Sequence, residues 1–130
     1  MAVESRKKRI LIIDDELSFL RMLKLNLERT GRFEVYGEIN GTRALEMVRS
    51  FRPDLILLDV VMPEIGGEEV AKQLKADKQL CLIPIVFLTA TVTRDEVQPP
   101  PVHLGEYVFL AKPAALAEVL ACIDKHLPPE

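Results

Sequence analysis

The sequence predicts an α/β domain with a single, doubly wound, five-stranded parallel sheet, and two observations carry this prediction. Short apolar runs alternate five times with segments of helical periodicity along the 130 residues. The apolar residues within these runs are largely continuous, which is typical of parallel strands buried on both faces. Such alternation produces a sheet covered by helices on both sides through right-handed crossovers. A chain of this length fits one domain.

The first half of the chain contains three predicted strands, at residues 9–13, 33–38 and 55–58. A helix follows the first strand, because residues placed 100° apart align four leucines on one stripe before Gly31: Leu17, Leu20, Leu23 and Leu27. A second helix is predicted between the next two strands. Asn40 is a suitable N-cap for it, Pro53 closes it, and its apolar residues are Ala44, Leu45 and Val48.

The second half predicts two further strands, at residues 84–88 and 107–110. A third helix after Gly67 carries Val70, Ala71 and Leu74, and the final helix has one apolar face: Leu116, Val119, Leu120, Ile123 and Leu127. Any helix between residues 91 and 105 should be short, at most about one turn, because each interior proline costs a helix about 3 kcal/mol. The prolines are Pro99, Pro100 and Pro101, and the irregular segment should cover part of the sheet with Val97, Val102 and Leu104.

Composition and charge exclude several classes of protein. Hydrophobic residues make up 48% and charged residues 28% of the chain, which is unlike a disordered protein. The net charge of −3 gives no positive field for nonspecific binding to nucleic acid or an anionic membrane, so the basic run at residues 6–9 is interpreted as a solvated tail. No apolar run is long enough to span a membrane. A cytoplasmic protein without membrane or direct nucleic-acid contact is expected.

The two cysteines, Cys81 and Cys122, lie far apart in apolar contexts. Two cysteines and two histidines at these spacings are neither a disulfide framework nor a zinc site. Both are expected to be buried thiols.

Five polar side chains lie within two residues after the ends of predicted strands: Asp14, Asp15, Asp59, Thr89 and Lys112. The carboxyl ends of parallel strands meet at one edge of the sheet, where ligands bind in such folds. Taken one at a time, each residue has an ordinary role, such as capping a helix. Together, three carboxylates in one cleft repel one another and need a counter-charge, which Mg²⁺ and Lys112 can supply. Such a cleft suits a phosphoryl group.

Five motifs occur in order along the chain: Ile13-Asp14-Asp15-Glu16; Leu57-Leu58-Asp59-Val60-Val61-Met62-Pro63 followed by Gly67; Phe87-Leu88-Thr89-Ala90; Gly105; and Leu110-Ala111-Lys112-Pro113. This order resembles the receiver domain of two-component response regulators. The resemblance implies a flavodoxin-like strand order 2-1-3-4-5. It also implies an N-terminal tail at residues 1–8, a receiver domain at 9–127, and a C-terminal tail or the start of a linker at 128–130.

The resemblance implies a role for each of these residues. Asp59 is the expected phosphoacceptor, attacking a phosphohistidine on a sensor histidine kinase or phosphotransfer protein. Mg²⁺ would be held by Asp14, Asp15, Asp59 and the main-chain carbonyl of Val61. Lys112 would pair with the acceptor carboxylate and then with the transferred phosphoryl group. Thr89 would donate its hydroxyl to that group and move inward, and Phe109 stands where the family places an aromatic switch.

Two apolar residues of the first predicted helix, Phe19 and Met22, lie off its sheet-facing stripe and should flank the cleft. Since receivers resemble one another in docking their phosphodonor along this helix, we interpret them as docking residues. Replacing both by alanine should then slow transfer from a protein donor and leave transfer from acetyl phosphate unchanged. The ordinary interpretation is that exposed apolar residues are scattered without function.

Other functions of the same topology are less consistent with the sequence. A nucleotide-binding enzyme should carry a glycine-rich loop where Asp14-Asp15-Glu16 stands. A dehalogenase-type phosphatase needs a second carboxylate at position 61, which is Val61. A phosphorylation-independent interaction module with a receiver fold remains as the alternative. We expect no enzymatic activity beyond self-catalysed transfer to Asp59 and slow self-dephosphorylation, since Val61 cannot hold a hydrolytic water by hydrogen bonding.

Overall fold

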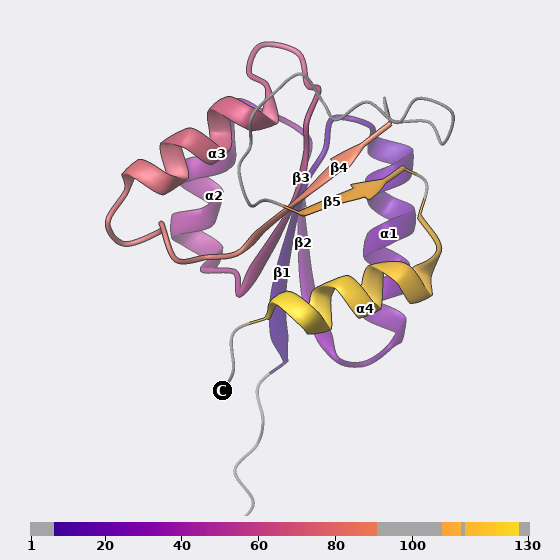
Figure 1. Cartoon of the computed structure of the whole chain (residues 1–130). Helices are drawn as coiled ribbons and strands as arrows, with labels where there is room; N and C mark the ends of the chain where they lie inside the picture. The colour runs from indigo at the N-terminus through magenta and orange to yellow at the C-terminus, as the bar shows by residue number, and fades with distance from the viewer. Residues whose placement is uncertain (1–6, 91–107, 113, 128–130) are drawn as a thin grey trace, which may run out of the picture.

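The computed structural model describes residues 7–90, 108–112 and 114–127. Its centre is a parallel five-stranded sheet in the order β2-β1-β3-β4-β5, which confirms the predicted fold class and strand order (Figure 1). The strands are β1 Lys8–Ile13, β2 Phe33–Glu38, β3 Leu55–Asp59, β4 Ile85–Thr89 and β5 Val108–Ala111. The predicted strands are thus correct to within one residue wherever the structure describes them.

Helices cover both faces of the sheet, with α1 and α4 on one face and α2 and α3 on the other (Figure 1). Their bounds are α1 Leu17–Arg29, α2 Ala44–Phe51, α3 Gly67–Ala76 and α4 Leu116–His126, and a 3₁₀ turn, η1 Gly41–Arg43, precedes α2. Asn40 caps η1 rather than α2, because its side chain accepts a hydrogen bond from the Thr42 amide. The expected Asn40 cap is therefore correct in position but serves the tighter turn.

Two apolar clusters, one on each face, hold the layers together. Every residue of β3 is buried, which explains why this strand is a continuous apolar run. Burying each such aliphatic side chain stabilises the fold by about 1.5–3 kcal/mol. Met47 joins the cluster beneath α2 and α3, although the periodicity did not single it out, whereas Leu45 is only partly buried. The central strand is therefore a rigid base for the residues that follow it.

Three burial expectations need correction. Leu17 is 42% exposed, although the other three leucines of its stripe are buried. It is the first residue of α1, next to the end of β1, so it has less of the sheet to pack against. Cys81 and Cys122 are half-buried rather than buried.

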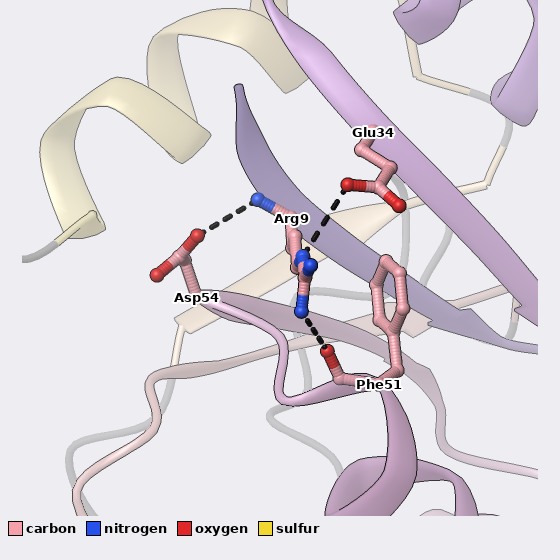
Figure 2. A network of polar contacts seen from close by, with 4 residues as sticks. All are labelled: Arg9, Glu34, Phe51 and Asp54. Carbon is pink, nitrogen blue, oxygen red and sulfur yellow. Dashed lines mark hydrogen bonds and ion pairs between the residues drawn. The ribbon is translucent and has the colours of Figure 1, made fainter. Parts of the chain in front are cut away.

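A polar network ties the amino end of β1 to its neighbours (Figure 2). The Arg9 guanidinium donates to the Phe51 carbonyl at 2.8 Å and to Glu34 Oε1 at 3.3 Å. The backbone amide of Arg9 donates to Asp54 Oδ2 at 2.8 Å. One residue thereby joins β1 to β2 and to the end of α2.

The proline-containing segment expected at residues 91–105, with its short or disrupted helix and Val97, Val102 and Leu104, lies outside the described residues. Within the described part of the chain, no helix is long and apolar enough to cross a membrane.

Candidate functional site

Three carboxylates gather where β1 and β3 end. The two strands are parallel neighbours, with Ile13 paired to Leu58, so Asp14 and Asp59 follow at the same level of the sheet. One ligand oxygen from each of Asp14, Asp15 and Asp59 lies within 4.8 Å of the others. We call these three residues the acidic pocket. They lie together at one edge of the sheet, as their places after the strands predict.

The members of the acidic pocket differ in burial. Asp14 is fully buried and Asp59 is 5% exposed, whereas Asp15 is exposed. Asp14 Oδ1 accepts a hydrogen bond from the Glu16 amide at 2.8 Å, which fixes the turn between β1 and α1. Asp14 Oδ2 is buried and accepts no hydrogen bond of good geometry among the described residues. A buried, ionised carboxylate oxygen without a well-aligned hydrogen bond needs a positive charge beside it.

Lys112 supplies the positive charge of the site. Its side chain is 7% exposed, and its Nζ lies 2.9 Å from Asp14 Oδ2 and 3.7 Å from Asp59 Oδ2. The exposed Glu16 adds a third carboxylate, with Oε1 at 3.1 Å from Nζ. The sequence-based interpretation pairs Lys112 with Asp59, and in the structure this contact is the longest of the three.

These surroundings change the ionisation of Asp59. Burial and the neighbouring Asp14 carboxylate raise the pKa of Asp59 to about 7, and a hydrogen bond with the Asp15 side chain acts in the same direction. The Lys112 ammonium and the Val61 amide, which donates a hydrogen bond, act in the opposite direction. Burial alone would lower the pKa of Lys112, but the carboxylates of Asp14, Asp59 and Glu16 raise it, so the ammonium stays charged.

The ends of β4 and β5 complete the edge of the sheet. Thr89 is the last residue of β4 and is 3% exposed. Its carbonyl accepts a hydrogen bond from the Lys112 amide at 2.9 Å, which fixes the start of the lysine side chain. Phe109 pairs with Phe87 across the sheet, and their rings stack with centroids 5.4 Å apart. Phe109 is half-buried and packs against the apolar cluster beneath α2 and α3.

A close backbone contact positions the loop after Asp59. The Gly67 amide donates to the Val60 carbonyl at 2.8 Å where α3 begins. A Cβ atom at position 67 would lie 2.1 Å from the Asp59 carbonyl oxygen, so only glycine fits without a shift of the backbone. The start of α3 is therefore packed directly against the residue expected to accept the phosphoryl group.

The sequence did not predict two contacts of Lys112, one with Glu16 and one with the ring of Phe19. The Ile13-Asp14-Asp15-Glu16 motif predicts no role for Glu16, yet its carboxylate lies 3.1 Å from the Lys112 Nζ. Phe19 was expected to flank the cleft, and its ring does lie beside the site, with the Lys112 Nζ 4.7 Å from the ring centroid. Met22 is 48% exposed one turn further along α1. The only sequence signal for the first contact is the acidic residue after the Asp pair.

The donor set of the acidic pocket fits a divalent cation. Mg²⁺ prefers oxygen ligands and is commonly held by one or two carboxylates with water in its other positions. Asp14, Asp15 and Asp59 supply three carboxylates at suitable spacing, and the buried Asp14 Oδ2, which lies beside the Lys112 ammonium, accepts no hydrogen bond of good geometry among the described residues. Asp15 and Val61 are both exposed to solvent.

The comparison with protein families decides what kind of domain this is. The model of the "Response regulator receiver domain" matches residues 10–124. The chain belongs to the response regulator receiver family. Members of this family accept phosphoryl groups in two-component systems and bind Mg²⁺ in an acidic pocket.

Individual relatives agree with this assignment. The chain is 40% identical over 121 residues to the alkaline phosphatase synthesis transcriptional regulatory protein PhoP of Bacillus subtilis, covering 92% of this chain and 48% of PhoP. It is 31% identical to the polar-differentiation response regulator DivK of Brucella anthropi, covering 92% of this chain and 96% of DivK. The chain thus spans about half the length of PhoP and nearly all of DivK.

A solved structure shows the same arrangement. The chemotaxis protein CheY4 of Vibrio cholerae superposes with a TM-score of 0.80 at 28% sequence identity, covering 94% of this chain and all of CheY4. The family assignment and the fold therefore rest on sequence and on structure independently.

Proposed function

We propose that this receiver domain accepts a phosphoryl group on Asp59 from a phosphohistidine donor and thereby changes its binding to a partner. One observation carries the proposal: the buried Asp59 carboxylate lies beside two further carboxylates and the Lys112 ammonium. Phosphoryl transfer requires an in-line nucleophile and neutralisation of charge on the equatorial oxygens. The described side chains supply both requirements.

In the transfer step, a carboxylate oxygen of the ionised Asp59 attacks phosphorus. The new O–P bond forms as the P–N bond to the donor imidazole breaks, and the imidazole nitrogen keeps the electron pair and takes up a proton. Lys112 is placed to pair with the transferred oxygens, because its Nζ already lies 3.7 Å from Asp59 Oδ2. Bound Mg²⁺ would supply charge neutralisation at the same oxygens. Asp14, Asp15, Asp59 and the Val61 main-chain carbonyl are the proposed ligands.

The proposed switch involves Thr89 and Phe109. Phosphorylation adds negative charge and acceptor oxygens at the end of β3, and the Thr89 hydroxyl at the end of the neighbouring strand is the proposed donor to them. The half-buried ring of Phe109, stacked on Phe87, is the proposed reporter of that movement. The change would be a repacking of side chains on the face covered by α2 and α3.

The proposed donor is a sensor histidine kinase or a phosphotransfer protein that docks along α1. Both proposed docking residues are on α1: Met22 is exposed, and the ring of Phe19, one turn before it, lies beside the Lys112 ammonium. Met22→Ala is expected to slow transfer from a protein donor and to leave the fold intact. Direct contact with nucleic acid is not expected of this domain, although PhoP is named as a transcriptional regulator.

The phosphorylated form is proposed to be long-lived. The Val61 side chain is 62% exposed beside Asp59 and carries no group that could orient a water molecule. A half-life of minutes or less for the phosphorylated protein would contradict this.

Mass spectrometry tests the proposed function directly. Incubation with Mg²⁺ and acetyl phosphate should add the mass of one phosphoryl group to the wild-type protein and none to Asp59→Asn. Addition of EDTA should prevent the gain. A wild-type protein that gains no mass while it still binds a partner would instead support the phosphorylation-independent interaction module.

A further inference from the structure

The face of the Phe19 ring lies against the Lys112 ammonium. The Nζ atom is 4.7 Å from the ring centroid, within the range of a cation–π interaction. The ring itself is partly buried and packs against the apolar cluster between the sheet and helices α1 and α4. The core therefore holds the ring from behind, while one face of it meets the charge.

Lys112 needs such a support because its side chain is long and its neighbours compete for it. A lysine side chain has four rotatable carbon bonds and a compact charge, so its position is set by what surrounds it. Asp14 and Glu16 hold the Nζ at 2.9 and 3.1 Å, closer than Asp59 at 3.7 Å. Without a fixed contact on another side, the ammonium can follow the exposed Glu16 away from the acceptor.

We propose that Phe19 is a positioning residue for phosphoryl transfer, because the face of its ring holds the Lys112 ammonium beside Asp59. The inference rests on the proposed function and adds to it a residue that acts through Lys112. An ammonium that is already in place when the phosphoryl group arrives stabilises the transition state without rearrangement. The ring also excludes water from one side of the charge, which strengthens that stabilisation.

The contact changes one expectation from the sequence. As a docking residue alone, Phe19 should affect transfer from a protein donor and leave transfer from acetyl phosphate unchanged. As a support for Lys112, it should affect both donors, since acetyl phosphate needs the same ammonium. The small donor therefore separates positioning from docking.

The test measures the rate of phosphorylation by acetyl phosphate with Mg²⁺ in three variants of the full chain. Phe19→Leu keeps an apolar side chain but removes the ring face, and we expect the rate to fall about three- to tenfold. Phe19→Tyr keeps the ring face and should stay within about twofold of wild type. Leu25→Ala truncates an apolar side chain that is 50% exposed elsewhere on α1, and it controls for general damage to the helix. Equal rates for Phe19→Leu and wild type would overturn the inference.

A double-mutant cycle shows whether the effect passes through Lys112. In a Lys112→Met background, Phe19→Leu should cause no further loss of rate, because the charge it supports is gone. A loss of the same size in both backgrounds would mean that Phe19 acts by another route and would overturn the inference.

A spectroscopic measurement checks the contact without phosphorylation. The ring current of Phe19 should shift the ε-methylene protons of Lys112 upfield in the wild type and in Phe19→Tyr, and the shift should vanish in Phe19→Leu. Unchanged proton shifts in Phe19→Leu would contradict the contact itself. If the wild-type protein gains no phosphoryl group on Asp59, the proposed function fails and the positioning role fails with it. If the wild type is phosphorylated but the ring is irrelevant to the rate, the positioning role alone fails.

Discussion

At the scale of single residues, the carboxyl group of Asp59 is the most strongly perturbed group of the site. Its pKa is raised from 3.8 to about 7 by burial and by Asp14. Between about pH 4 and pH 7, Asp59 of the metal-free protein is therefore protonated in the folded state and ionised in the unfolded state. The contribution of Asp59 to the free energy of unfolding is fully present below the unfolded-state pKa, and it is lost as the pH rises from about 4 to about 7.

Asp59→Asn should consequently stabilise the metal-free protein at alkaline pH. We expect the free energy of unfolding to rise by about 2–4 kcal/mol near pH 8, because the substitution removes a buried negative charge. The gain should shrink to less than about 1 kcal/mol near pH 4. Urea unfolding in EDTA at both pH values measures it, and a gain independent of pH would contradict the explanation.

Arg9 offers a second prediction at this scale. Its guanidinium contacts both the Phe51 carbonyl and Glu34, and a lysine cannot reproduce this forked geometry. Arg9→Lys should lower the free energy of unfolding by about 1 kcal/mol. Glu34→Gln breaks only the exposed ion pair and should cost less than about 0.5 kcal/mol. Similar losses in the two variants would show that the Phe51 carbonyl contributes little.

The sequence indicated which residues occupy the acidic pocket but not all of their contacts. The places of Asp14, Asp15 and Asp59 follow from the ends of two neighbouring strands, and the backbone alone brings them together. The contacts of Lys112 depend on the path of a flexible side chain. Its approach to Glu16 and to the face of Phe19 therefore became visible only in three dimensions.

At the scale of elements, the start of α3 is tied to the phosphoacceptor through Gly67. Gly67→Ala should force the backbone of Asp59 or of the helix to shift, because its Cβ would lie 2.1 Å from the Asp59 carbonyl oxygen. We expect a loss of about 1–3 kcal/mol in the free energy of unfolding, together with slower phosphorylation by acetyl phosphate.

The neighbouring glycine provides a matched control. A Cβ at Gly66 would meet only the Val60 carbonyl oxygen, at 3.4 Å, and Gly66 has a φ of −76° that alanine adopts readily. Gly66→Ala should therefore lower the free energy of unfolding by less than about 1 kcal/mol, which is the cost of replacing glycine by alanine at the N-cap of α3. Equal losses at both positions would mean that the loop, rather than the close approach at Gly67, is sensitive to substitution.

The strands could be predicted more accurately than the burial of helical residues. A strand buried on both faces, such as β3, is a continuous apolar run whatever packs on it. The apolar periodicity of a helix indicates only which residues lie on the same face of that helix. How many of them are buried depends on how far the sheet extends beneath the helix. Leu17 shares the stripe of Leu20 and Leu23 but is exposed at the first turn. The cap at Asn40 also could not be assigned to the right element from the sequence. Its side chain caps a 3₁₀ segment, which the periodicity of the sequence does not distinguish from the start of an α-helix.

At the scale of the whole molecule, the carboxyl end of the sheet gathers like charges, which the amino end does not. The Arg9 side chain ties the amino end of the sheet to its neighbours, whereas the carboxyl end holds three carboxylates within 4.8 Å of one another beside Lys112. Like charges at this spacing destabilise the metal-free protein. The binding of a divalent cation should therefore stabilise the entire fold and not only the pocket.

Mg²⁺ should raise the melting temperature through this site. At about ten times its dissociation constant, a ligand that binds only the folded state adds about 1.4 kcal/mol, which corresponds to roughly 3–6 °C for a domain of this size. Differential scanning calorimetry with MgCl₂, compared with KCl of equal ionic strength, measures the shift. Asp15→Asn removes an exposed carboxylate of the pocket, so it should weaken binding and reduce the shift while leaving the metal-free protein folded. Glu46→Gln changes an exposed carboxylate on α2, outside the acidic pocket, and should retain the full shift. A shift of the same size in Asp15→Asn and the wild type would place the stabilising ion outside the acidic pocket.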